Sequence, residues 1–409
     1  MAGLGQEIWR AARLIKRLSV GPIPRIGRRF NSTESITVRI NRALAETPPC
    51  AAFDVLAEYS RSGNNLPTKY MFALQEKLRK SPEPLLVRLF VDLLPLTAVR
   101  HRHKFVNGAV DLYISLGDLE TALDFIREVQ IVNSGAFEFQ YEVLERMIIA
   151  AKYQNDAEIA WQAMQMIVAN SSNMVYARTW GIFLSTILEA RHHESLQWFY
   201  KTAAIPGFIV LDDSSYLSMA SIAAENGDPH MCRWAALRMR RRQRALGVSS
   251  PPKDLLKVFV YLVEASAGKG EYKAACRYIV RLRDSTSSLR SSDFHQLLAL
   301  LRSEDTVFEY YIGIYHEMST DPLANEAVKT LLFNLLLESR IQATQYQQGL
   351  TLYQHARDAA VVFNNTSRLL IVHLGTALWD KSLIESMKCG DPKVDQAVST
   401  ALESVDQSV

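Results

Sequence analysis

The sequence predicts an all-α protein, an α-solenoid of stacked antiparallel helix pairs. Apolar residues recur at helical spacing almost throughout from about residue 40, and the alternating patterns of β-strands are missing. Short turn signals recur near positions 117, 155, 192, 227, 270 and 303, at intervals of 33 to 43 residues. A period of this length that holds two helices indicates repeats, because each pair buries its apolar face only by stacking on its neighbours.

The first 37 residues differ in character from the rest of the chain. Residues 1–30 hold seven lysines and arginines and a single acid, and on a helix they form an apolar stripe of Leu4, Ile8, Ala11, Ile15 and Leu18. Such a leader is typical of a mitochondrial presequence, and "RRFNSTES" (28–35) resembles a processing site of matrix proteins. We therefore expect a presequence and processing region at 1–37. The alternatives are a disordered basic tail or a peripheral membrane helix.

The remaining chain has a low net charge. The whole chain carries +3 and residues 1–30 carry +6, so residues 31–409 sum to about −3. Because such a chain has no general field that attracts nucleic acid, any contact with nucleic acid has to use local patches. No apolar run approaches the roughly 18–20 residues of a membrane span, so no integral membrane segment is expected. The four cysteines stand far apart, which favours small buried side chains over a zinc site or a disulfide framework.

The clearest helix pair is "FVNGAVDLYISLGDLETALDFIREVQ" (105–130). Gly117 can take the left-handed conformation at which a helix ends, and Asp118 can cap the next helix. The same layout recurs around Gly227-Asp228 and Gly270-Glu271, with weaker copies near Asn155, His192 and Ser303. We expect these repeats to fill residues 101–360.

The segments outside the repeats are less regular. Residues 38–100 predict two or three helices, as an N-terminal cap or as degenerate repeats. Residues 361–389 predict C-terminal capping helices, and residues 390–409 predict a frayed polar tail. Five tryptophans stand at helical positions among aliphatic residues, where burial between helices is favoured over base stacking: Trp161, Trp180, Trp198, Trp234 and Trp379.

The repeats resemble those of the pentatricopeptide family, most closely at "GDLETALDFIREV" (117–129) and more loosely at 178–200 and 214–240. Tetratricopeptide repeats share the period, but their small-residue and proline pattern is not cleanly present. The resemblance implies a right-handed superhelix that binds single-stranded RNA along its first helices, one base per repeat. It also implies no cofactor.

In that family, base choice depends partly on a polar residue near the start of each first helix. The residue at this position is Asn107 in the repeat that turns at Gly117, and an amide side chain suits base edges. In the following repeats the position holds Glu145, Gly181, Leu217 and Val260. Because three of these side chains cannot form hydrogen bonds, a readable base code is largely absent. Either backbone and shape hold the RNA, or the helical groove binds a protein.

The most basic patch is "RWAALRMRRRQRALG" (233–247), which has no acid. A second patch lies at 277–290 and a third at "RHRHK" (100–104). The first two lie on second helices of successive repeats, so we expect stacking to join them into one ridge that binds phosphates, on ribosomal RNA or another RNA. An acidic protein partner and a solvated outer face are the alternatives. The candidate RNA-binding arginines are Arg233, Arg238, Arg240, Arg241, Arg242, Arg244, Arg277 and Arg281.

No catalytic or metal-binding pattern was found. Glycine-rich phosphate loops, the G-x-S-x-G motif and the H-E-x-x-H motif are missing, and adjacent histidines such as His192 and His193 point in different directions on a helix. We therefore expect a mitochondrial RNA-binding protein, not an enzyme, that supports maturation, stability or translation of an organellar transcript or ribosomal RNA. The alternative is a protein-binding adaptor, such as an assembly factor for a respiratory complex or a component associated with the mitochondrial ribosome.

Overall fold

The structure is a computed structural model that describes residues 35–46, 49–61, 66–97, 99–132, 137–170, 175–245, 253–281 and 289–407. The predicted presequence helix lies outside these residues. The chain divides into two compact units, residues 1–209 and 210–409. The described residues contain helices and one isolated β-bridge, between Leu66 and Thr97, but no strand. The all-α prediction is therefore confirmed.

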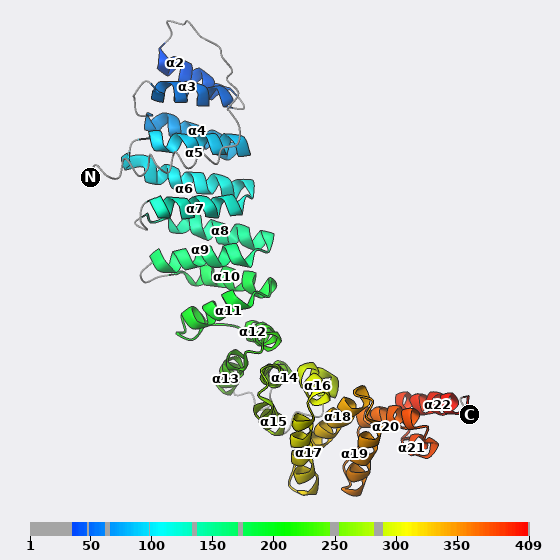
Figure 1. Cartoon of the computed structure of the whole chain (residues 1–409). Coiled ribbons are helices and arrows are strands. Elements are labelled where there is room, and N and C mark those ends of the chain that lie inside the picture. Colours follow the sequence, from blue (N-terminus) through cyan, green and yellow to red (C-terminus); the bar gives the residue numbers. More distant parts are fainter. Residues whose placement is uncertain are drawn as a thin grey trace. The chain divides into compact units, whose positions relative to one another are not determined.

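The first unit is a stack of antiparallel helix pairs. Figure 1 shows α4 to α10 side by side in chain order, and each first helix packs on the first helix of the next pair as well as on its own partner. The helices of this unit are α2 (Ile36–Ala45), α3 (Cys50–Arg61), α4 (Thr68–Lys80), α5 (Pro84–Leu93), η1 (Leu94–Leu96), α6 (Val99–Leu116), α7 (Leu119–Val132), α8 (Tyr141–Gln154), α9 (Ala157–Asn170), α10 (Ala177–Glu189), α11 (His193–Phe199) and the π-helical η2 (Tyr200–Ala204).

The second unit continues the same plan. Its first helices α12, α14, α16, α18, α20 and α22 pack on one another in that order. The helices of this unit are α12 (Asp213–Glu225), α13 (Pro229–Ala245), α14 (Lys253–Gly268), α15 (Tyr272–Val280), η4 (Ser291–Asp293), α16 (His295–Ser303), α17 (Asp305–Thr320), α18 (Glu326–Gln342), α19 (Tyr346–Asp358), α20 (Asn365–Leu378), α21 (Lys381–Glu385) and α22 (Pro392–Asp406). Stacked antiparallel pairs are thus present in both units, as predicted, while the right-handed winding stays a prediction.

The turn within most pairs is built in one way. The first helix ends at a residue with positive φ, and the N–H of the following residue bonds to the carbonyl five residues earlier, for example from Asp118 to Tyr113 at 3.1 Å. In several pairs that following residue then caps the second helix: the Asp118 carboxylate accepts the N–H of Thr121 at 3.2 Å. The left-handed residues are Gly117, Asn155, Arg191, Gly227, Gly270, Thr344 and Trp379.

Helix α18 is buried along most of its length. In α18, every residue from Val328 to Leu337 is buried. The helix packs against α16, α17, α19 and α20, and its buried stretch includes the polar residues Lys329, Thr330 and Asn334 as well as aliphatic ones. Within the described ranges, no helix combines the length and the apolar character that a membrane span requires.

The C-terminal tail differs from the prediction. Residues 392–406 form α22, an ordered helix whose Val394, Val398 and Val405 are buried against the unit. Asp391 caps the helix by accepting the N–H groups of Lys393 and Val394, and Pro392 occupies its first position. Val394, Val398, Ala401 and Val405 are spaced four, three and four residues apart, so they form an apolar stripe despite the polar composition.

The structure also differs from the expected number of N-terminal helices and from the expected burial of some tryptophans and cysteines. Residues 38–100 contain α3, α4, α5 and most of α2, which is four helices and not two or three, and α2 packs on α3 as α4 does on α5. Their interpretation as a cap or as degenerate repeats stays a prediction. Trp379, the left-handed residue at the end of α20, is 57% exposed. Trp180 is buried as expected. Of the cysteines, Cys50 and Cys389 are exposed.

The left-handed turn can be tested at Gly270, which has a φ of +77° and open space where a Cβ would stand. We expect Gly270→Ala to lower the free energy of unfolding by about 1–2 kcal/mol, because only the backbone conformation is penalised. Gly313, inside α17, also has open space but an ordinary helical backbone. Gly313→Ala should raise stability by about 0.5–1 kcal/mol. Urea unfolding measures the free energy of unfolding of both variants. Equal changes in the two variants would show that the left-handed turn does not require Gly270.

Candidate nucleic-acid interface

The residue predicted to read a base, Asn107, lies inside the first unit. Its side chain is 2% exposed. The amide nitrogen donates to the carbonyl oxygen of His103 at 2.9 Å, and the amide oxygen accepts the N–H of Gln140 at 2.9 Å. The side chain therefore joins α6 to the start of α8 and is not available to a base in this structure.

The corresponding positions of later repeats also offer few polar side chains that a base could contact. Glu145 accepts a hydrogen bond from the hydroxyl of Thr179 at 2.6 Å, so its carboxylate is also engaged with the next first helix. Gly181 has no side chain, and Val260 is buried. The polar groups near the start of the first helices α6 and α8 thus hold neighbouring repeats together.

Glu264 on α14 is a buried acidic example of this arrangement. Its two carboxylate oxygens accept the N–H groups of Gln296 at 2.7 Å and Leu297 at 3.2 Å, in the first turn of α16. The residue before α16 is Phe294, whose side chain does not cap the helix. Glu264 caps it instead, from the neighbouring repeat. Burial raises the pKa of Glu264, and the two N–H groups oppose that rise.

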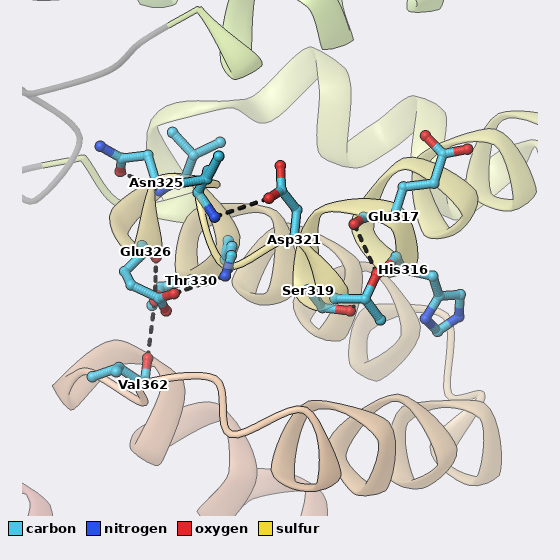
Figure 2. Close-up of polar contacts among 12 residues, drawn as sticks. His316, Glu317, Ser319, Asp321, Asn325, Glu326, Thr330 and Val362 are labelled. Carbon is cyan, nitrogen blue, oxygen red and sulfur yellow. Dashed lines mark hydrogen bonds and ion pairs between the residues drawn. The ribbon is translucent and has the colours of Figure 1, made fainter.

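The hydroxyl of Thr330 also connects neighbouring repeats, here α18 and the residues before α20. Figure 2 shows Thr330 between two backbone carbonyls: its oxygen lies 2.9 Å from the carbonyl oxygen of Glu326 in its own helix and 2.9 Å from that of Val362, which precedes α20. Asn325 caps α18 in the same view by accepting the N–H of Val328 at 3.2 Å. Neighbouring repeats are therefore tied by polar contacts in both units.

The cationic face of the second unit lies on α13. The helix buries an apolar side that includes Met231, Cys232, Ala235 and Met239, and burial raises the pKa of the Cys232 thiol. We define the cationic face by four of the five exposed arginines of the helix, Arg233, Arg240, Arg241 and Arg244; the fifth, Arg242, is bound to the chain before α12. The helix contains no acid that could offset them.

The other two arginines of α13 are held in place. The guanidinium of Arg238 lies 5.6 Å from the ring centroid of Trp234, within the range of a cation–π contact. Arg242 donates to the carbonyl oxygen of Leu211 at 3.0 Å and lies 3.5 Å from the carboxylate of Asp213. The contact of Arg238 lies within α13, whereas the contacts of Arg242 join α13 to the start of α12.

The remaining predicted arginines lie on a different helix. Arg277 is exposed on α15 and Arg281 is exposed just after it, and Arg277 donates to the carbonyl of Lys273 within the same helix. Helices α13 and α15 both pack on α14. A continuous ridge across them stays a prediction. In the third predicted patch, Arg102 is half-buried and bonds to the carbonyls of Pro95 and Thr97, so it is a structural residue.

The charge of the second unit is divided along the chain. Residues 211–281 hold twelve lysines and arginines against seven acids, whereas residues 289–407 hold nine against fifteen. The cationic face of α13 therefore belongs to the basic part of this unit. Such a local excess of charge can attract an anionic partner although the chain as a whole is nearly neutral.

A cavity of about 230 Å³ opens between α16 and α18. Its walls carry groups of both charge signs, including His295, Arg302 and Glu338. Among the described residues, no group of three or more histidines, cysteines or acids is placed to hold a metal ion. The cavity brings together none of the residues predicted from the sequence.

Comparison with known proteins gives similarity only at the level of solved structures. No family model and no curated protein matches the sequence. One similar structure is that of the pentatricopeptide repeat protein PPR10 from maize, with 11% identity and a TM-score of 0.28 over 99% of this chain and 61% of that one. PPR10 in complex with an 18-nt psaJ RNA element shows 10% identity and a TM-score of 0.27 over 87% and 58%.

Both structures are pentatricopeptide repeat proteins, the family that the sequence resembles. This chain spans about three fifths of the length of those solved chains. Because the TM-scores lie below 0.5, the fold assignment is based on the helix pairs described above.

The contact between repeats can be tested at Glu264. We expect Glu264→Ala to lower the free energy of unfolding by about 1–3 kcal/mol, because it leaves two N–H groups at the start of α16 without an acceptor. Amide hydrogen exchange at Gln296 and Leu297 should accelerate. The matched control is Glu317→Ala on the exposed side of α17, which should change stability by less than about 0.5 kcal/mol. Unchanged exchange in the Glu264 variant would show that the capping role is wrong.

Proposed function

We propose that the protein is an RNA-binding helical-repeat protein and that the cationic face of α13 contacts the RNA phosphates. The observation that carries this proposal is the set of four exposed arginines on one helix without an acid. Guanidinium groups bind phosphate oxygens in pairs, and this geometry suits arginine better than lysine. Arg242 supports the face by joining α13 to the carbonyl of Leu211, and Arg238 packs on Trp234 of the same helix.

The first helices contribute the scaffold in this proposal. Asn107 and Glu145 are engaged between repeats, and Gly181 has no side chain, so these three positions offer a base no free hydrogen-bonding group. We therefore expect affinity without strong sequence preference, since phosphate contacts position a protein on a nucleic acid but carry no sequence information. RNA is also the ligand in the solved complex of PPR10, a protein of the same repeat class.

We place this activity in the mitochondrial matrix, on the basis of the basic amphipathic segment at residues 1–37. Binding to an organellar transcript or to ribosomal RNA there would support its maturation, stability or translation. Both the compartment and the process are proposals that come from the sequence.

A second candidate function is favoured by the charge of the C-terminal repeats. Residues 289–407 carry fifteen acids against nine bases, which suits a basic protein partner better than RNA. The protein would then be an adaptor for a mitochondrial assembly, and the arginines of α13 would be a solvated face.

RNA binding by the cationic face is tested with a variant that carries Gln at positions 233, 240, 241 and 244. We expect its affinity for a labelled RNA hairpin with a single-stranded extension to fall at least ten-fold. The slope of log affinity against log salt should fall by about 3, because each lost phosphate contact removes roughly 0.7–0.9. Fluorescence anisotropy over a series of salt concentrations measures both quantities.

The matched control removes four exposed charges from the C-terminal repeats, at Arg357, Lys381, Lys388 and Lys393. This variant should keep at least half of the affinity. If the unmodified chain binds no RNA, or if both variants lose affinity equally, the cationic face is not an RNA site and the adaptor function is favoured.

The predicted compartment has a direct test. Residues 1–37 fused to a fluorescent protein should carry it into mitochondria, because a presequence combines positive charge with an apolar stripe. Changing Arg10, Arg13 and Arg17 to Glu should abolish import, while changing them to Lys should preserve it. Import of the Glu variant, or a cytosolic signal from the unmodified fusion, would contradict the proposed location.

A further inference from the structure

We infer that the RNA bound by the cationic face is double-stranded; this inference rests on the proposed function. It concerns the class of RNA and follows from three features of α13: the row in which its arginines lie, the placement of its aromatic ring, and the choice of arginine over lysine.

The arginines of α13 form a straight row. At 100° per residue, positions 240 and 244 each point within about 20° of position 233, on opposite sides of it. They extend over eleven residues, so the row is about 16 Å long at a rise of 1.5 Å per residue. Arg241 points about 80° away from it. All four side chains are exposed, and no contact in the described chain ties the three that form the row.

A rigid row of charges matches a rigid ligand. An A-form duplex presents its phosphates at fixed positions, so the row can meet several of them without ordering the ligand first. A flexible single strand would have to be straightened along the helix, and this ordering reduces affinity. Double-stranded RNA is recognised mostly through its shape and its backbone, and such contacts require no base-reading side chains.

The aromatic side chains lead to the same conclusion. Proteins that bind single strands without sequence preference stack bases on exposed rings. Helix α13 has one Phe, Tyr or Trp ring, that of Trp234, which is half-buried; its exposed His230 stands in the first turn, before the row begins. Its ring packs edge-on against Tyr216 with centroids 5.4 Å apart, and Arg238 lies beside it. The exposed apolar residue of the face is Leu237, which offers no stacking surface.

All charges on the cationic face are guanidinium groups. Planar guanidinium groups bind two phosphate oxygens at once, whereas an ammonium acts as a point charge. A face made of arginines therefore gains most from phosphates whose orientation is fixed, as in a duplex. Helix α13 carries no lysine.

The inference is tested with the full chain and a 20-base-pair RNA duplex of mixed sequence. Anisotropy titrations at one salt concentration compare the duplex with each of its two strands alone. We expect the duplex to bind at least five-fold more tightly than either strand, and a second duplex of unrelated sequence to bind within two-fold of the first.

Two exposed arginines supply the matched variants. Arg240→Gln removes a member of the row and should weaken duplex binding about three- to ten-fold, while Arg357→Gln, on α19 and outside the cationic face, should weaken it less than two-fold. Circular dichroism should be unchanged for both, because both side chains are exposed. Equal losses of duplex affinity in the two variants would show that the row of arginines does not bind the duplex.

The remaining outcomes separate this inference from the proposed function. If single strands bind as tightly as the duplex, or more tightly, the duplex inference is wrong but RNA binding stands. If neither duplex nor single strands bind, the proposed function itself fails.

Discussion

The left-handed turn that closes most helix pairs is the constraint on which the rest of the structure depends. A left-handed residue ends the first helix, and the next N–H bonds five residues back, as from Asp228 to Ala223 at 2.8 Å. Because this turn is so short, the second helix has to run back along the first. The apolar faces of each pair then point to the neighbouring pairs, and stacking is the arrangement that buries them. The turn thus determines where the exposed face of α13 lies.

Polar residues have different roles on the first and the second helices of the pairs. On the first helices, Asn107, Glu264 and Thr330 are used to hold the next repeat, in places where a solenoid could otherwise offer groups to a ligand. On the second helix α13, the arginines are left exposed because only its opposite side packs against α12 and α14. This division explains why charge, and not a base code, is the strongest functional signal in the described chain.

Much of the fold could be predicted from the sequence, because Gly-Asp turns and helical periodicity are local signals. The left-handed Arg191 and Thr344 have no such signal, since their conformation is set by packing of the pairs. Spacing could not show whether Asn107 faces a groove or, as the structure has it, a neighbouring repeat. The polar composition of residues 390–409 favours a frayed tail, and this prediction is wrong. The spacing of Val394, Val398 and Val405 predicts the apolar stripe of α22 better than the composition does.

The central claim is that RNA contacts this protein at the cationic face of α13. Ultraviolet crosslinking of the full chain to RNA in isolated mitochondria, with the crosslinked residues located by tandem mass spectrometry, tests it most directly. The account predicts crosslinks concentrated between residues 233 and 244. Crosslinks confined to the first helices α6 to α10, or their absence from the whole chain, would contradict it.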